Sequence, residues 1–192
     1  MKPTNKAHFL DRLESRVEQH IMEAVSHFQN LPEPVLLEPA KDGGWSIAQC
    51  LDHLNGYGDY YLPQIKKGLD NAKSYPFKST FKSSWLGSYF TRMMEPETGK
   101  KKMKAFKNHI PSPHPDAYAV VATFIQQQEA LLQYLKQAGR ADLNKIRIPV
   151  SIAKFVKLNL GDVFQFLIAH NERHIRQAKR NIPEKVSNFQ LS

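Results

Sequence analysis

The sequence has its clearest helix start at Gly43-Gly44-Trp45-Ser46-Ile47-Ala48-Gln49-Cys50. Ser46 and Gln49 have the spacing of a capping box, in which each side chain bonds the backbone N–H of the other residue. Trp45 and Cys50 have the spacing of a hydrophobic staple across the same helix end. This stretch predicts a helix from about residue 46 to residue 65, because apolar residues continue at helical spacing. We expect Pro63 to kink that helix or to end it early, since proline removes a backbone donor.

Three further segments, residues 6–29, 116–137 and 159–180, carry apolar residues every three or four positions. This is the period of an amphipathic helix. Residues that can cap a helix stand at the start of each segment: Thr4 or Asn5, then Asp116, then Asn159 with Asp162 at capping-box spacing. The sequence therefore predicts four long helices.

The connection between the second and third helices, roughly residues 70–115, is unusually long. Such a connection is typically functional, forms a lid or is loosely ordered, and it allows the two helices that it joins to run parallel. Aromatic residues between Trp85 and Met93 predict one short helix within it. Residues 146–158 alternate weakly, which is compatible with an extended segment but is not enough to predict a sheet. The fold class expected is all-α, a single four-helix bundle domain over residues 1–192 with a long insertion between helices two and three.

The composition is that of a globular protein with an excess of positive charge. The chain has 192 residues, a formal net charge of +9 and one cysteine, Cys50. A single cysteine excludes an internal disulfide and agrees with a reducing compartment, and no apolar run approaches the ~20 residues of a membrane helix. We therefore expect a cytoplasmic protein with no membrane partner. The dense basic run at residues 100–104 lies in an irregular region without a reading motif, so nucleic-acid binding is not expected.

Among the eight histidines, only His170 and His174 lie four residues apart. This spacing places both on one helix face, which here is apolar. Imidazoles that point into a core need partners, because burying unpaired polar groups costs on the order of 1–3 kcal/mol each. His53 on the second helix also tends inward, and three neutral imidazoles suit a divalent transition metal with open positions. Alternatively, the pair is half exposed and His53 only bonds a backbone carbonyl.

Other residues near these histidines have weaker signals. Tyr57 and Gln177 are candidates to orient a ligand in the active site, although Tyr57 fits a core position and Gln177 fits a helix-cap or surface position. Glu172 does not complete a zinc-protease motif, because Asn171 directly follows His170. At ~100° per residue Glu172 faces away from His170, so we expect a solvated surface charge. No carboxylate is therefore an obvious general base.

Two segments carry a resemblance to a known family, residues 44–54 with the Trp45-Ser46 helix start and His53, and residues 160–177 with His170 and His174. They resemble the DinB superfamily, the DinB/YfiT-like family of proteins regarded as metal-dependent enzymes. The resemblance implies a four-helix bundle in which His53, His170 and His174 bind nickel, zinc or a similar divalent ion. Many members carry an acidic residue directly after the first of the two paired histidines, where this chain has Asn171.

The same resemblance implies two kinds of activity on a small-molecule substrate, hydrolysis or transfer of a low-molecular-weight thiol. Both activities depend on the same electrostatic effect of a divalent ion, which lowers the pKa of a bound water to about 7 and deprotonates a bound thiol. The alternative is a non-catalytic bundle that binds a small molecule or a partner protein, with the metal structural or absent. Bundles of this kind often pair through exposed helix faces, so a homodimer is also possible.

Overall fold

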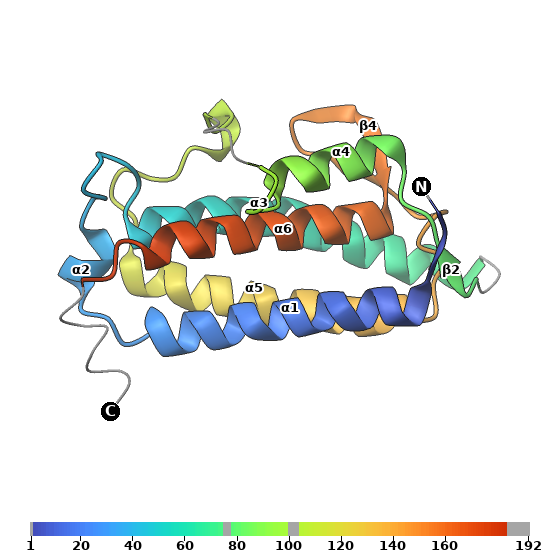
Figure 1. The fold of residues 1–192 in the computed structure, drawn as a ribbon, viewed down its shortest axis with the longest axis horizontal. Coiled ribbons are helices and arrows are strands. Elements are labelled where there is room, and N and C mark those ends of the chain that lie inside the picture. Colours follow the sequence, from blue (N-terminus) through green and yellow to red (C-terminus); the bar gives the residue numbers. More distant parts are fainter. Residues whose placement is uncertain (1, 75–77, 100–103, 184–192) are drawn as a thin grey trace.

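The computed structural model describes residues 2–74, 78–99 and 104–183. Within these residues four long helices form a bundle, as predicted (Figure 1), and two short helices, two short 3-10 turns and two small two-stranded sheets surround it. The long helices are α1 (Lys6–His27), α3 (Ile47–Asp70), α5 (Ala117–Ala138) and α6 (Leu160–Lys179). The smaller elements are α2 (Glu33–Leu37), α4 (Trp85–Met94), η1 (Asn71–Ser74), η2 (Lys107–His109), β1 (Thr4–Asn5), β2 (Thr80–Phe81), β3 (Arg147–Val150) and β4 (Ala153–Asn159).

The capping box at the start of α3 is confirmed. The Gln49 N–H donates to Ser46 Oγ at 3.1 Å, and the Ser46 N–H donates to Gln49 Oε1 at 3.1 Å. Helix α3 does not end at Pro63 but continues to Asp70. The extra turns extend α3 to the far end of the bundle, so the early end that proline suggested is wrong.

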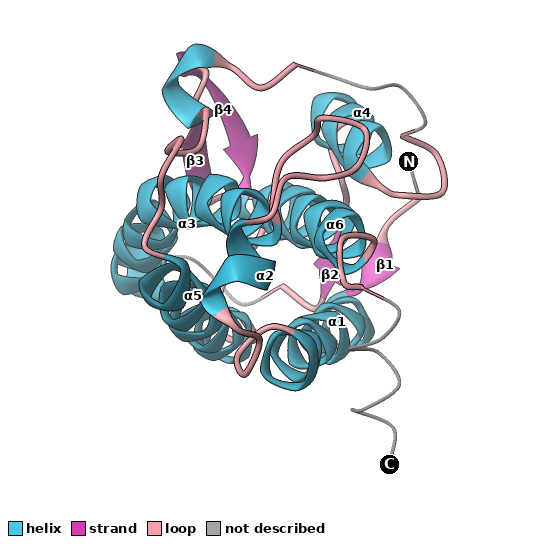
Figure 2. Cartoon of the chain, turned by 90° about the vertical axis from the view of Figure 1, so that its left-hand side faces the viewer, coloured by secondary structure: helices cyan, strands magenta, loops and turns pink. Residues whose placement is uncertain are grey.

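The direction of the helices explains the long insertion. In Figure 1, α3 and α5 run in the same direction, opposite to α1 and α6. Neighbouring parallel helices cannot be joined by a tight turn, and residues 71–116 provide the connection between α3 and α5. The insertion contains β2, the predicted short helix α4, and η2. Figure 2 shows α4 and the β3–β4 hairpin on the outer side of α3 and α6.

The predicted capping box at the start of α6 is wrong. Asn159 is the N-cap but makes no side-chain cap bond. The fully buried Asp162 carboxylate instead accepts from Ser84 N–H at 3.1 Å and Ser84 Oγ at 2.7 Å, and also from the Ser83 hydroxyl. A Cβ on Gly87 would lie 2.1 Å from the Asp162 carboxyl carbon, so only glycine allows this approach. Asp162 therefore holds the start of α4 against α6.

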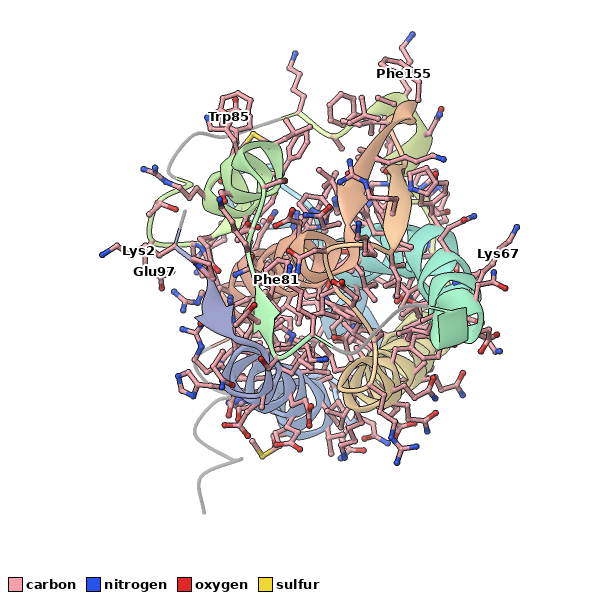
Figure 3. All side chains as sticks on the ribbon, turned by 90° about the vertical axis from the view of Figure 1, so that its right-hand side faces the viewer. Lys2, Lys67, Phe81, Trp85, Glu97 and Phe155 are labelled. Atoms are coloured by element: carbon pink, nitrogen blue, oxygen red, sulfur yellow. The ribbon has the colours of Figure 1, made fainter. Side chains whose placement is uncertain are left out.

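The β3–β4 hairpin was not predicted from the sequence. Its strands pair antiparallel, with a register shift at Pro149–Val150. Ile148 and Leu158 are buried in the core, whereas Phe155 is 90% exposed. Figure 3 shows the outward position of Phe155 and the inward position of Phe81 of β2. The hairpin depends on packing against the bundle, which a weak local alternation does not reveal.

Two apolar clusters fill the bundle, one toward each end. The first contains Val17, Leu131 and Leu167, and the second contains Ala24, Phe124 and Ile175. Between these positions on the helices lie buried polar residues: His20, Asn55, Gln128, His170 and Asn171. The bundle thus has a polar layer near its middle. Within the described part of the chain, every helix is too short or too polar to cross a bilayer.

Candidate metal centre

Three histidines from two helices converge beside this polar layer. His53 comes from α3, and His170 and His174 come from successive turns of α6. Each offers one ring nitrogen, and the three nitrogens all lie within 4.8 Å of one another. His53 Nε2 and His170 Nε2 are 3.2 Å apart. The structure therefore brings together the three residues that the sequence singled out, while metal binding by them stays a prediction.

All three imidazoles are held in the neutral form. His53 and His170 are 4% and 3% exposed. Burial lowers the pKa of His53 to about 4 and that of His174 to about 3, because the charged form loses its hydration. Burial also lowers the pKa of His170 well below its ordinary value, and the neighbouring His174 and His53 act in the same direction. At neutral pH each ring therefore has one nitrogen with a free lone pair.

In two of the three rings, a hydrogen bond determines which nitrogen keeps the free lone pair. His53 Nδ1 lies 2.5 Å from the His109 backbone oxygen, and His174 Nδ1 lies 3.0 Å from Gln177 Oε1. Both oxygens only accept, so each Nδ1 carries the proton and each Nε2 keeps its lone pair. Such outer partners typically fix the tautomer and orientation of metal-binding histidines.

The donor set fits a divalent transition metal. Zinc–nitrogen distances of 2.0–2.1 Å in a tetrahedral site correspond to nitrogens roughly 3.3 Å apart, close to the 3.2 Å between His53 Nε2 and His170 Nε2. His170 Nδ1 is buried and has no hydrogen-bond partner among the described residues. With the His170 proton on Nδ1, the lone pairs of His53 Nε2 and His170 Nε2 face each other. A cation between these two nitrogens would stabilise that arrangement. Three protein ligands leave a fourth position open, as in catalytic zinc sites.

Tyr57 and Gln177 both lie at this cluster. Gln177 bonds His174 directly, so its place in the structure is that of a positioning residue. The Tyr57 ring packs edge-on against His170, with centroids 4.4 Å apart. Burial raises the pKa of Tyr57 to about 12, so its hydroxyl stays protonated and can donate at neutral pH. Cys50 is fully buried and burial raises the pKa of its thiol to about 12, as expected for a small core residue.

A wide cleft opens over the histidines. Trp45, just before α3, forms one wall of the cleft. The centroid of its ring lies 4.8 Å from that of the His53 ring and 5.8 Å from that of the His174 ring. The cleft lining is mainly basic among its charged residues: Lys41, Lys104, Arg173, Arg176 and Arg180 against Glu38 and Asp42. The cluster is thus reachable by a small molecule, and negative charge on that molecule would be attracted.

His109 is a site residue that the sequence reasoning missed. Its backbone oxygen orients His53, and its ring stacks on Tyr57 with centroids 4.0 Å apart. The chain is held there by α3, because Asp52 Oδ2 accepts from the Ser112 N–H at 2.8 Å. His109 lies in the long insertion at no fixed spacing from His53. No sequence pattern would have found it.

Glu172 faces away from the three histidines as expected, but the prediction of a solvated charge is wrong. Its side chain is 23% exposed and bonds Arg16 of α1 at 2.8 Å. The His20 ring, 3.9 Å away, and the Arg16 guanidinium hold the pKa of Glu172 well below its usual range. Asn171 is also buried and donates to Gln128 Oε1 of α5 at 2.9 Å. Both residues therefore connect α6 to other helices.

Comparisons with known proteins agree with this geometry. Among solved structures, the chain resembles YfiT from Bacillus subtilis, described as a probable metal-dependent hydrolase with an unusual four-helix bundle topology. The two have 13% sequence identity and a TM-score of 0.55, and the match covers 90% of this chain and 85% of that one. This likeness shows the fold. No curated protein matches the chain in sequence. The sequence profile of the DinB superfamily matches residues 16–178, which is most of the chain, and the chain therefore belongs to the DinB superfamily.

Proposed function

We propose that this protein is a metal-dependent enzyme, a hydrolase or a low-molecular-weight thiol transferase, in which His53, His170 and His174 hold a divalent transition metal, nickel or zinc. The observation that carries the proposal is the convergence of three neutral imidazoles within 4.8 Å beneath an open cleft. The description of the similar YfiT structure as a probable metal-dependent hydrolase supports the same reading. An ion held there would supply a water or thiol nucleophile of lowered pKa.

The chain's own groups have separate parts in this proposal. His109 and Gln177 keep the metal-binding nitrogens deprotonated and aimed at one point. Tyr57 is protonated at neutral pH and lines the cleft beside His170, so we assign to it the donation of a hydrogen bond to a substrate oxygen. Among the described residues, no carboxylate joins the three-histidine group. Lowering the pKa of the nucleophile is therefore more important here than a carboxylate general base.

A panel of ester hydrolysis and thiol-transfer assays with zinc, nickel or no metal tests the proposal. We expect one of the two activities to depend on added metal and to fall at least about a hundredfold in His174→Ala, which removes one ligand. The exposed His8 of α1 provides the matched control, and His8→Ala should retain activity. Equal activity with and without metal, or in both variants, would contradict the proposal.

The alternative, a non-catalytic bundle with a structural ion, makes a different prediction. A structural ion has no open position, and its removal typically unfolds a domain. Here two large apolar clusters stabilise the bundle on either side of the histidines. We therefore expect the metal-free protein to keep its helical circular dichroism. Unfolding by a chelator would favour the structural role.

A further inference from the structure

A small apolar pocket lies between α4 and the β3–β4 hairpin, on the outer side of α3 and α6. Figure 2 shows both elements above these two helices. Phe90 and Met93 of α4 form one wall, Ile152 of the hairpin turn forms another, and Phe166 of α6 belongs to the base. The cavity volume is about 30 Å³, enough for roughly two or three carbon atoms, since one water needs about 10–15 Å³ on this measure.

Two of the three polar side chains that line this pocket, those of Tyr61 and Ser151, are already engaged, and the third is Tyr57. The Tyr61 hydroxyl accepts from the Ser151 N–H at 3.1 Å, and Ser151 Oγ pairs with His109 Nε2 at 3.1 Å. A water molecule inside would therefore find few of the two to four partners that buried water needs. An alkyl or aryl group gains free energy in such a place, because it leaves water for an apolar lining.

The pocket adjoins the cleft over the histidines. Tyr57, Met94 and Phe106 line both of them. The Phe166 ring at the base stacks on His170, with centroids 5.8 Å apart. A molecule with its apolar group in the pocket can therefore extend past Tyr57 to the three histidines.

The basic lining of the cleft indicates the charge of the part of the molecule that lies outside the apolar pocket. Lys41, Lys104 and Arg180 line it and form no ion pair with a carboxylate among the described residues. An anionic group near the cleft would therefore meet cations that are not already paired.

We propose that the substrate is a small anionic molecule whose apolar group binds in the pocket between α4 and the β3–β4 hairpin while its reacting group lies at the three histidines. This substrate class rests on the proposed metal-dependent function. The two pocket walls, with Met93 on one and Ile152 on the other, then set the size of the apolar group that is accepted.

Calorimetric titration of the zinc-loaded protein with straight-chain carboxylates, from acetate to octanoate, tests this inference. Each added methylene is expected to lower the dissociation constant about fourfold until the pocket is filled. The heat-capacity change of binding should become more negative over the same range, since apolar surface is buried. A dissociation constant independent of chain length would overturn the inference.

Two variants of the hairpin locate the effect. Ile152 is 41% exposed at the pocket wall, so Ile152→Glu places a charge there with little risk to the core. It should abolish the dependence on chain length. Phe155→Glu is the matched control, because Phe155 is 90% exposed on the same hairpin and does not line the pocket. Equal losses in both variants would contradict the assignment. Met93→Glu tests the opposite wall if Ile152→Glu does not fold.

Metal content measured on the same samples separates this inference from the proposed function. Stoichiometric zinc without chain-length dependence would overturn the substrate class and leave the metal-dependent function in place. Chain-length dependence in a protein that binds no zinc would support the pocket and contradict the metal-dependent function.

Discussion

Two faces of α6 carry pairs of polar residues at the same four-residue spacing, with different surroundings. One face carries His170 and His174, which lie with His53 and have no carboxylate in their group among the described residues. The other carries Glu172 and Arg176, which bond each other at 2.5 Å. Arg16 of α1 completes this second group by bonding Glu172 at 2.8 Å.

The two faces of α6 differ in whether their polar side chains have partners of opposite charge. In the second group each charge has a partner: Arg16 also pairs with Glu95 at 2.8 Å, and Arg176 with Glu97 at 2.8 Å. Such a group needs no ligand, and it connects α1 and α6 with the segment after α4. The histidine group instead presents lone pairs without a positive charge between them, which is the arrangement that a cation completes. Residue spacing alone therefore does not separate a binding site from a structural contact.

Removing a histidine should have the largest effect. In His170→Ala we expect the affinity for zinc or nickel to fall at least about a hundredfold, because a ligand matters at least as much as the residue that orients it. Metal content by mass spectrometry of protein prepared without a metal-affinity column measures this. His8→Ala, on the exposed side of α1, should bind as wild type. The same metal content in wild type and His170→Ala would show that the histidine group is not a metal site.

Removing the partner of a histidine should have a smaller effect. Gln177→Leu leaves His174 Nδ1 without its acceptor, and we expect metal affinity to fall about 10–100-fold. Gln177→Glu keeps an acceptor at that place and should retain most of the affinity. Gln137→Leu on the exposed side of α5 serves as control. Wild-type affinity in Gln177→Leu would mean that His174 is oriented by other contacts.

Removing a charge from the compensated face should reduce stability and leave metal binding unchanged. Arg16→Met deprives Glu95 and Glu172 of a shared partner, and these side chains are 24% and 23% exposed. We expect the free energy of unfolding in urea to fall by about 1–2 kcal/mol. Lys66→Met breaks an exposed pair with Asp70 and should cause no measurable change. A loss of metal in Arg16→Met would show that the two faces are coupled.

The smallest effect expected is the pH dependence of the Glu23–Lys179 pair, a further contact of α6 with α1 at 2.5 Å. Burial alone would raise the pKa of Glu23, but hydrogen bonds from Lys179 and Gln19 hold it below its ordinary value of 4.5. The folded pKa lies below the unfolded one, so the stabilisation is present above pH 4.5 and is lost as pH falls through the folded pKa.

Urea unfolding of wild type and Glu23→Gln between pH 7 and pH 3 measures this effect. The two proteins should differ by about 0.5–1 kcal/mol at pH 7 and converge on acidification. A difference that grows toward acid pH would mean that the folded pKa of Glu23 is raised, against the expectation here.

Much of the fold could be predicted because its signals are local. The capping box of Ser46 and Gln49 involves residues three positions apart, and Asp116 caps α5 by accepting the Ala119 N–H at 3.0 Å. The convergence of His170 with His174 also follows from helical spacing. That His53 meets them was an inference from its inward side of α3, which the structure supports with a 3.2 Å approach to His170.

The remaining features depend on contacts between distant parts of the chain. Asp162 has the spacing to cap its own helix, yet it bonds Ser83 and Ser84 because the insertion brings buried donors to it. Glu172 is not a solvated surface charge, because its carboxylate bonds Arg16, which lies 156 residues earlier in the chain. His109 reaches His53 only after the insertion folds over α3. None of these partners has a periodic signal.

Because α3 and α5 run parallel, the residues proposed to bind the metal and most residues proposed to select the substrate lie in different parts of the chain. The candidate ligands lie on α3 and α6, while α4 and Phe106, which contact the apolar pocket, belong to the insertion that the parallel arrangement requires. Under the proposed substrate class, exchanging residues on the pocket-facing side of α4 would change which molecules are accepted without moving His53, His170 or His174. His109, in the same insertion, is the exception, because a deletion that removes it also removes the acceptor for His53. Redesign of substrate preference would thus begin with α4 and leave residues 106–112 intact.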